Sequence, residues 1–121
     1  MSPTLSWSLL GWLVLNALLL SAGQILFKLA ADQGHALKPW WMQLATNPLF
    51  LSALALYAVA TGLWVWILRQ TPLQLAYPFV ALAYLFVPLA AHFLLNEPLR
   101  WQSLAGAAVI GLGIWISVSG R

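Results

Sequence analysis

The stretch LLGWLVLNALLLSAGQILFK at residues 9–28 decides the fold class, because a nearly unbroken apolar run ends there in polar residues. A helix needs about 20 mostly apolar residues to cross the roughly 30 Å of hydrocarbon in a bilayer. The whole chain of 121 residues is 63% hydrophobic and only 6% charged, whereas soluble domains have about a quarter charged residues. The sequence therefore predicts an all-α membrane protein.

Four apolar segments fill almost the whole chain. We expect transmembrane helices at residues 5–29, 49–68, 73–95 and 101–118, within a single domain that spans 1–121. The connections 69–72 and 96–100 are short enough to predict tight turns, so the second, third and fourth helices should pack as sequential hairpins. Because residues 1–6 contain no Lys or Arg, we expect the first helix to be retained rather than cleaved as a signal peptide.

The connections have local signals of their own. Residues 30–48 include the pair Trp40 and Trp41, which favours a loop at the membrane interface. Pro78 and Pro88 predict a bent third helix, since each removes a backbone donor. The run 96–98, Asn-Glu-Pro, is typical of a helix start, with a short polar cap and an early proline.

Composition excludes several classes of function. The chain has no cysteine and two histidines, and it has no paired carboxylates, Ser-His-Asp set, phosphate-binding glycine loop or zinc-ligand spacing. We therefore expect no enzymatic activity, no metal and no cofactor. The net charge of +3 comes from side chains scattered over predicted helix ends, not from the clustered basic face of a nucleic-acid-binding protein. Basic residues on the two sides of the membrane differ by one, so orientation stays open.

A polar stripe marks the end of the first helix. Ser21, Gln24 and Lys28 share one face, and Asn16 lies on the adjoining seam. A lysine inside hydrocarbon is costly, although near a helix end it can extend toward the headgroups. Lys28 could thus be a topology anchor paired with Asp32, or it could attract an anionic phosphate. Gln24 favours the second interpretation, because an anchor needs no second polar group one turn deeper.

Aromatic residues at helical spacing predict a groove. Tyr57, Thr61 and Trp64 share a face of the second helix, and Tyr77 and Tyr84 share a face of the third. Such side chains combine a ring with a polar group and suit a polar, ring-bearing ligand, although the same spacing is common in plain helix packing. The candidate binding residues are Lys28, Gln24, Ser21, Tyr77, Tyr84, Trp64 and Asn16.

Glycines on the fourth helix predict an assembly. Gly106 and Gly113 are seven residues apart and lie on one face, and small residues let membrane helices approach closely. Four helices alone enclose little interior, so we expect a dimer with these glycines at its interface, or else packing within the monomer. The weak charge bias leaves both parallel and antiparallel dimers open.

Motifs along most of the chain resemble the small four-helix members of the drug/metabolite transporter superfamily, most of all the Arn-type subunits that flip undecaprenyl-phosphate-linked aminoarabinose. The matching elements are SAGQ with Lys28, Gln70, Pro72, Ala76-Tyr77-Pro78, Leu89-Ala90-Ala91, Glu97-Pro98, Gly106 and Gly113. The chain is also similar to the small multidrug resistance exporters, which are antiparallel dimers. Those exporters have a glutamate eight residues before the lysine of the first helix, and Leu20 stands at that position here.

The resemblance implies a flippase in the bacterial inner membrane that moves a polyprenyl-phosphate-linked sugar between leaflets, as a homodimer or with a paralogous subunit. Lys28 and Gln24 would bind the phosphate, Tyr77, Tyr84 and Trp64 would line the sugar path, and Arg69, Glu97 and His92 are gating or coupling candidates. The alternatives are a proton-coupled small-molecule exporter that uses Glu97 or His92, and a partner subunit that does not itself transport. The sugar and the energy source stay open.

Overall fold

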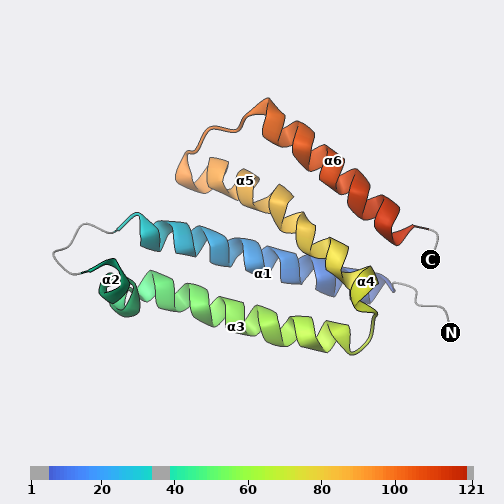
Figure 1. Ribbon diagram of the computed structural model, residues 1–121, viewed down its shortest axis with the longest axis horizontal. Helices are drawn as coiled ribbons and strands as arrows, with labels where there is room; N and C mark the ends of the chain where they lie inside the picture. Colours follow the sequence, from blue (N-terminus) through green and yellow to red (C-terminus); the bar gives the residue numbers. More distant parts are fainter. Residues whose placement is uncertain (1–5, 34–38, 120–121) are drawn as a thin grey trace.

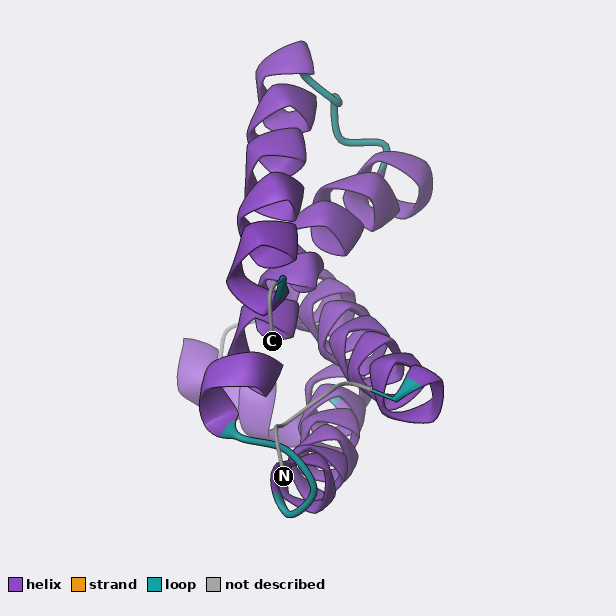
Figure 2. Ribbon diagram, turned by 90° about the vertical axis from the view of Figure 1, so that its right-hand side faces the viewer, coloured by secondary structure: helices purple, strands orange, loops and turns teal. Residues whose placement is uncertain are grey.

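The computed structural model describes residues 6–33 and 39–119, and every regular element in these ranges is a helix (Figures 1 and 2). Four of its helical stretches are long and apolar enough to cross a membrane. They are α1 (Trp7–Ala31), α3 (Pro48–Leu68), the composite Leu73–Leu95 and α6 (Trp101–Val118). The prediction of an all-α membrane protein with four spans is thus confirmed, and the first span lies two residues later than expected.

Polar caps fix where the first two spans begin. The Ser6 hydroxyl accepts a hydrogen bond from the backbone N–H of Leu9 at 3.1 Å. Asn47 Oδ1 accepts one from the N–H of Leu49 at 2.9 Å, and Pro48 occupies the first turn of α3, where a missing N–H costs nothing. Each cap satisfies a donor that the helix itself cannot.

The expected interface loop at residues 30–48 is partly helical. It contains α2 (Trp40–Thr46), which packs on α3 and leaves Trp40 and Trp41 exposed. Asn47 joins α2 directly to α3, and its Nδ2 donates to Gln33 Oε1 at 3.1 Å, which ties this joint to the end of α1. A seven-residue helix is too short to reveal itself by apolar periodicity.

The predicted helix start at residues 96–98 is wrong. Asn96 ends the third span in the left-handed conformation, with φ 57°, and α6 begins only at Trp101. Asparagine tolerates this conformation better than most residues and often closes a helix with it. The Glu97 N–H accordingly bonds back to the Ala91 carbonyl at 3.3 Å. A polar cap residue is used here at the end of a helix rather than at its beginning.

The third span is interrupted at one of its two prolines. It consists of α4 (Leu73–Ala76), the 3-10 segment η1 (Tyr77–Ala81) and α5 (Leu82–Leu95). Pro78 lies in the first turn of η1, whereas α5 continues through Pro88. The α-helical geometry therefore changes at Pro78, where a backbone donor is missing.

The helix α1 lies between two others (Figure 1). It packs on α3 along one side and on α5 along another, while α6 packs on η1 and α5. In its most apolar 18-residue stretch 39% of the residues are buried, against 6–17% in the other spans. The predicted hairpin of the second and third spans is therefore incorrect in its packing, because α3 meets that span mainly at α4, beside the connecting turn.

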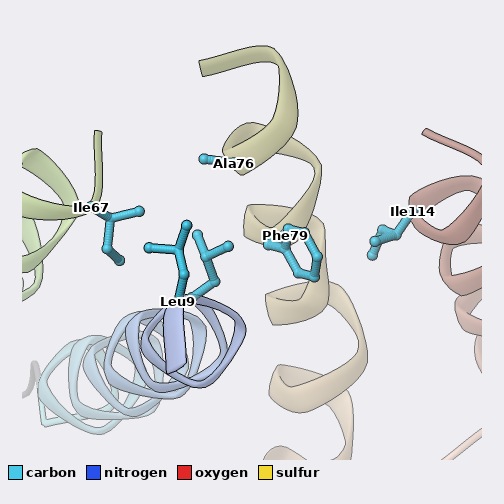
Figure 3. Packing of buried hydrophobic residues seen from close by; sticks show 6 residues of the cluster. Leu9, Ile67, Ala76, Phe79 and Ile114 are labelled. Carbon is cyan, nitrogen blue, oxygen red and sulfur yellow. The ribbon is translucent and has the colours of Figure 1, made fainter. Parts of the chain in front are cut away.

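A tight apolar cluster holds one end of the bundle together (Figure 3). It joins the beginning of α1 to the end of α3, to α4 and η1, and to the last turns of α6, through Leu9, Leu13, Ile67, Ala76, Phe79 and Ile114. The later turns of α1 and of α5 lie toward the other end (Figure 1).

Candidate functional site

Two grooves run along α1, one beside α3 and one beside α5. The first, here called the inner groove, lies between α1, α3 and η1 and has a volume of about 280 Å³. Its lining residues are Asn16, Leu20, Tyr57, Ala60, Thr61, Trp64, Tyr77 and Val80. The second, the lysine groove, lies between α1 and α5 and has a volume of about 390 Å³. Its lining residues are Gln24, Ile25, Lys28, Val87, Ala91, Leu95 and Glu97.

One hydrogen bond joins a residue of the lysine groove to a residue of the inner groove. Gln24 Nε2 donates to the hydroxyl of Tyr57, so a side chain that lines the lysine groove is joined to one that lines the inner groove. The Tyr57 ring also packs against Phe27, with ring centroids 5.2 Å apart. Gln24 thus has a defined acceptor on the neighbouring helix, and this contact links the linings of the two grooves.

Lys28 forms an ion pair at the outer end of the lysine groove. Its Nζ lies 3.0 Å from Asp32 Oδ1, one turn along α1, and the two side chains remain 51% and 56% exposed. An exposed pair of this kind contributes little to stability. The ammonium has three donors, and Glu97 lines the same groove. The groove is thus lined by one cation and one carboxylate, and a second carboxylate, Asp32, pairs with the cation.

Asn16 is the deepest polar residue of the inner groove. The residue is only 3% exposed, and its Oδ1 has no hydrogen-bond partner. Trp64 and Tyr77 line the same groove, with ring centroids 6.4 Å apart and planes at 65°. The Thr61 hydroxyl donates to the Tyr57 carbonyl at 2.8 Å, within its own helix. The unpaired, buried acceptor therefore belongs to a residue that lines a groove with aromatic walls.

A third groove is almost entirely apolar. It lies between α1 and α5 and has a volume of about 560 Å³. Ile25 lines both this groove and the lysine groove. Ser21 belongs to this apolar groove, and its buried hydroxyl donates to the Ala17 carbonyl at 2.7 Å. The packing of α5 on α1 therefore separates Ser21 from the rest of the predicted stripe.

The structure divides the predicted site residues. Those brought to the inner groove are Asn16, Trp64 and Tyr77, and those brought to the lysine groove are Gln24, Lys28 and Glu97. Tyr57 and Thr61 also line the inner groove. Both belong to the predicted aromatic stripe, but the predicted binding set does not include them. Their helical spacing from Trp64 is the sequence signal that would add them to the predicted binding residues.

The remaining candidates lie elsewhere. Tyr84 is 52% exposed and is not among the lining residues of the three grooves. Arg69 caps the end of α3, and His92 Nδ1 lies 2.9 Å from the Glu97 carbonyl oxygen at the end of α5. Arg69 and the His92–Glu97 contact are therefore at opposite ends of the bundle (Figure 1). On α6, a β-carbon at Gly106 or Gly113 would meet no atom within 4 Å.

Comparison with known proteins finds relatives whose names describe subunits of the same flippase. A protein of Erwinia tasmaniensis, named a probable 4-amino-4-deoxy-L-arabinose-phosphoundecaprenol flippase subunit ArnF, is 40% identical over 109 residues, which cover 82% of this chain and 85% of that protein. The Proteus mirabilis protein of the same name is 30% identical over 116 residues, 87% of each chain. An Enterobacter protein named as subunit ArnE is 32% identical over 103 residues, covering 84% and 89%. No solved structure matches.

The family comparison covers nearly the whole sequence. Residues 2–119 match the description "EamA-like transporter family", a group within the drug/metabolite transporter superfamily. This match confirms the resemblance that the motifs indicated. With four spans in the described residues, the protein is a multi-pass membrane protein. The chain belongs to the EamA-like transporter family.

Proposed function

We propose that this protein is a subunit of a flippase that moves an undecaprenyl-phosphate-linked sugar across the bacterial inner membrane. The proposal is supported by the names of relatives that match at 30–40% identity over most of both chains, each described as a subunit of a flippase for 4-amino-4-deoxy-L-arabinose-phosphoundecaprenol. The same sugar is the first substrate to test. Transport rather than catalysis is the role of these relatives.

The lysine groove is the proposed site for the phosphate. Lys28 is the cation that lines it, and Asp32 occupies only part of the donor capacity of the ammonium. A phosphate oxygen can therefore join or replace the Asp32 carboxylate without dismantling any buried contact. Glu97 and Asp32 both repel an anion, so the bound state is weak enough to release its lipid. Release matters in a flippase, because a ligand held tightly does not cross.

The head group would then advance toward the inner groove, past Gln24 and Tyr57. The hydrogen bond between these two side chains must open for a polar group to pass. The polyprenyl tail stays in the lipid, because the outer surfaces of α5 and α6 expose large apolar side chains that include Phe93, Leu94 and Trp115. Only the polar head needs a protein path.

We further propose that α6 provides the contact with a second subunit. Gly106 and Gly113 leave open space where a β-carbon would be, and only 11% of the residues in the apolar stretch of α6 are buried. Small residues allow close approach of a neighbouring helix. The relatives are named as subunits of two types, ArnE and ArnF, so a paralogous partner and a second copy are both to be tested.

Reconstitution tests the function directly. The full chain, alone and together with a paralogous subunit, is placed in liposomes with fluorescent undecaprenyl-phosphate aminoarabinose, and the rate of movement between leaflets is measured. Movement above that of protein-free liposomes supports the proposal. No movement with either composition, although both proteins are folded and inserted, would refute the flippase assignment.

Substitutions then test the phosphate site. Lys28→Ala should slow movement by about tenfold or more, because a charge-assisted contact to phosphate is lost. Asp32→Asn should keep or increase the rate, since it leaves the ammonium freer. Arg100→Ala removes an exposed cation at the start of α6 and serves as the matched control. If Lys28→Ala protein works at the wild-type rate, Lys28 is an anchor and this site assignment fails.

An exporter of organic cations is the second candidate, because Glu97 lines the lysine groove and could bind a cation or a proton. The inner groove, however, has no carboxylate among its lining residues, and Leu20 stands where the related exporters have a glutamate. Overexpression followed by a resistance panel of cationic compounds separates the two. Resistance that Glu97→Gln abolishes would favour the exporter.

A further inference from the structure

We infer that Asn16 is a specificity-determining residue, whose side-chain oxygen accepts a hydrogen bond from a hydroxyl or amine of the sugar as the head group passes through the inner groove. The inference rests on the proposed function and adds a second recognition step to it. Asn16 is the starting point because its Oδ1 is buried and unpaired, with only 3% of the residue exposed. A buried acceptor without a hydrogen-bond partner destabilises a fold. A donor on the ligand that pairs with Asn16 Oδ1 is the simplest explanation for such an acceptor here.

The surroundings of Asn16 suit a sugar ring. Trp64 and Tyr77 offer aromatic faces with their ring centroids 6.4 Å apart, and such faces pack against the apolar faces of sugars. The volume of about 280 Å³ is slightly below that of sites for drug-sized ligands. A single ring therefore fits better than a larger ligand.

The chemistry of the lining selects a donor. Asn16 Oδ1 is an acceptor, and the nearby Thr61 hydroxyl already donates to the backbone of its own helix. The lining contains no cation to hold a phosphate and no carboxylate to hold an isolated cation. A neutral groove with an unpaired buried acceptor thus favours hydroxyl or amine groups on an aromatic-stacked ring over the phosphate itself.

The two recognition steps must occur in succession. Asn16 and Lys28 are twelve residues apart on α1, which corresponds to about 18 Å along the helix axis. A sugar bonded directly to a phosphate is too short to bridge both positions. The phosphate is recognised at Lys28, and the sugar is recognised at Asn16 later in the crossing.

The experiment compares two lipids in the reconstituted flippase. One probe is undecaprenyl phosphate with aminoarabinose, and the other is undecaprenyl phosphate alone. Asn16→Leu keeps the approximate size of the side chain but removes the acceptor, and it should slow the sugar-linked lipid by about tenfold relative to the bare phosphate lipid. Lys28→Ala should slow both lipids. Thr46→Val, which removes one hydroxyl of α2 outside the three grooves, is the control and should change neither.

Thermal unfolding separates recognition from structure. Asn16→Leu removes an unpaired acceptor, so the melting temperature should stay the same or rise. A marked fall in melting temperature would mean that Asn16 has a structural partner, and it would overturn the inference. Equal slowing of both lipids, or no slowing of either, would also overturn it. In both cases a continued effect of Lys28→Ala would leave the flippase proposal intact, whereas an inactive wild-type protein would defeat the flippase proposal itself.

Discussion

The ring of Tyr57 on α3 packs directly against Gly23 on α1, where an added β-carbon would lie 2.6 Å from Tyr57 Cδ2. This close approach lets the Tyr57 hydroxyl reach Gln24, the next residue along α1. Gly23 therefore has a steric role at the junction of the inner groove and the lysine groove, which no other residue type could fill without moving the ring.

Gly23→Ala should displace Tyr57 and break its hydrogen bond with Gln24. Forcing an extra carbon into a packed contact costs about 1–3 kcal/mol, so the unfolding free energy should fall. Gly11→Ala is the matched control on the same helix, because a β-carbon there would meet no atom within 4 Å. Equal unfolding free energies for the two variants would show that the ring moves aside freely.

The Gln24–Tyr57 hydrogen bond should appear as an energetic coupling between two helices. Tyr57→Phe keeps the ring against Phe27 but removes the hydroxyl, and Gln24→Leu removes the donor. A double-mutant cycle on the unfolding free energy should give a coupling of about 0.6–1.5 kcal/mol, the usual value for such bonds between membrane helices. Strictly additive effects of the two substitutions would contradict the contact.

The sequence predicted the spans well, because apolar run length is a local property. Gln24 and Lys28 did come to one groove. Ser21 did not, since the position of a neighbouring helix decides which part of a stripe stays together, and α5 covers the stripe between Ser21 and Gln24. In lipid, helices that are apolar on all sides give no signal of which neighbour they choose.

Tyr84 lies apart from the grooves for a different physical reason. It is seven residues from Tyr77, a spacing that keeps two residues on one face of an α-helix. The segment η1 between them has 3-10 geometry, with about 3.0 residues per turn instead of 3.6, so the two faces lose register. Pro78 predicts a bend in the third span, but its presence in the sequence does not reveal that the number of residues per turn changes.

Asn96 should tolerate glycine better than alanine or valine. Its φ of 57° lies in the left-handed region, which costs a residue with a β-carbon about 1–2 kcal/mol and costs glycine little. Asn96→Gly should therefore unfold at nearly the wild-type temperature, and Asn96→Val should unfold well below it. Thermal unfolding in detergent measures the difference. If valine were harmless, the end of α5 would have to adopt another conformation.

Leu20 lines the inner groove together with Asn16, so a charge introduced there tests what the groove accepts. Leu20→Glu places a carboxylate on the path of an anionic head group, and like charges at close quarters are strongly unfavourable. We expect the flipping rate of the sugar-linked lipid to fall by about tenfold or more, and binding of hydrophobic cations to increase. Leu20→Gln introduces similar size and polarity without the charge, so it should retain much more transport. The two variants are compared in the same liposome assay, with cation binding measured by fluorescence. Equal losses in both would mean that shape rather than charge limits passage through the groove.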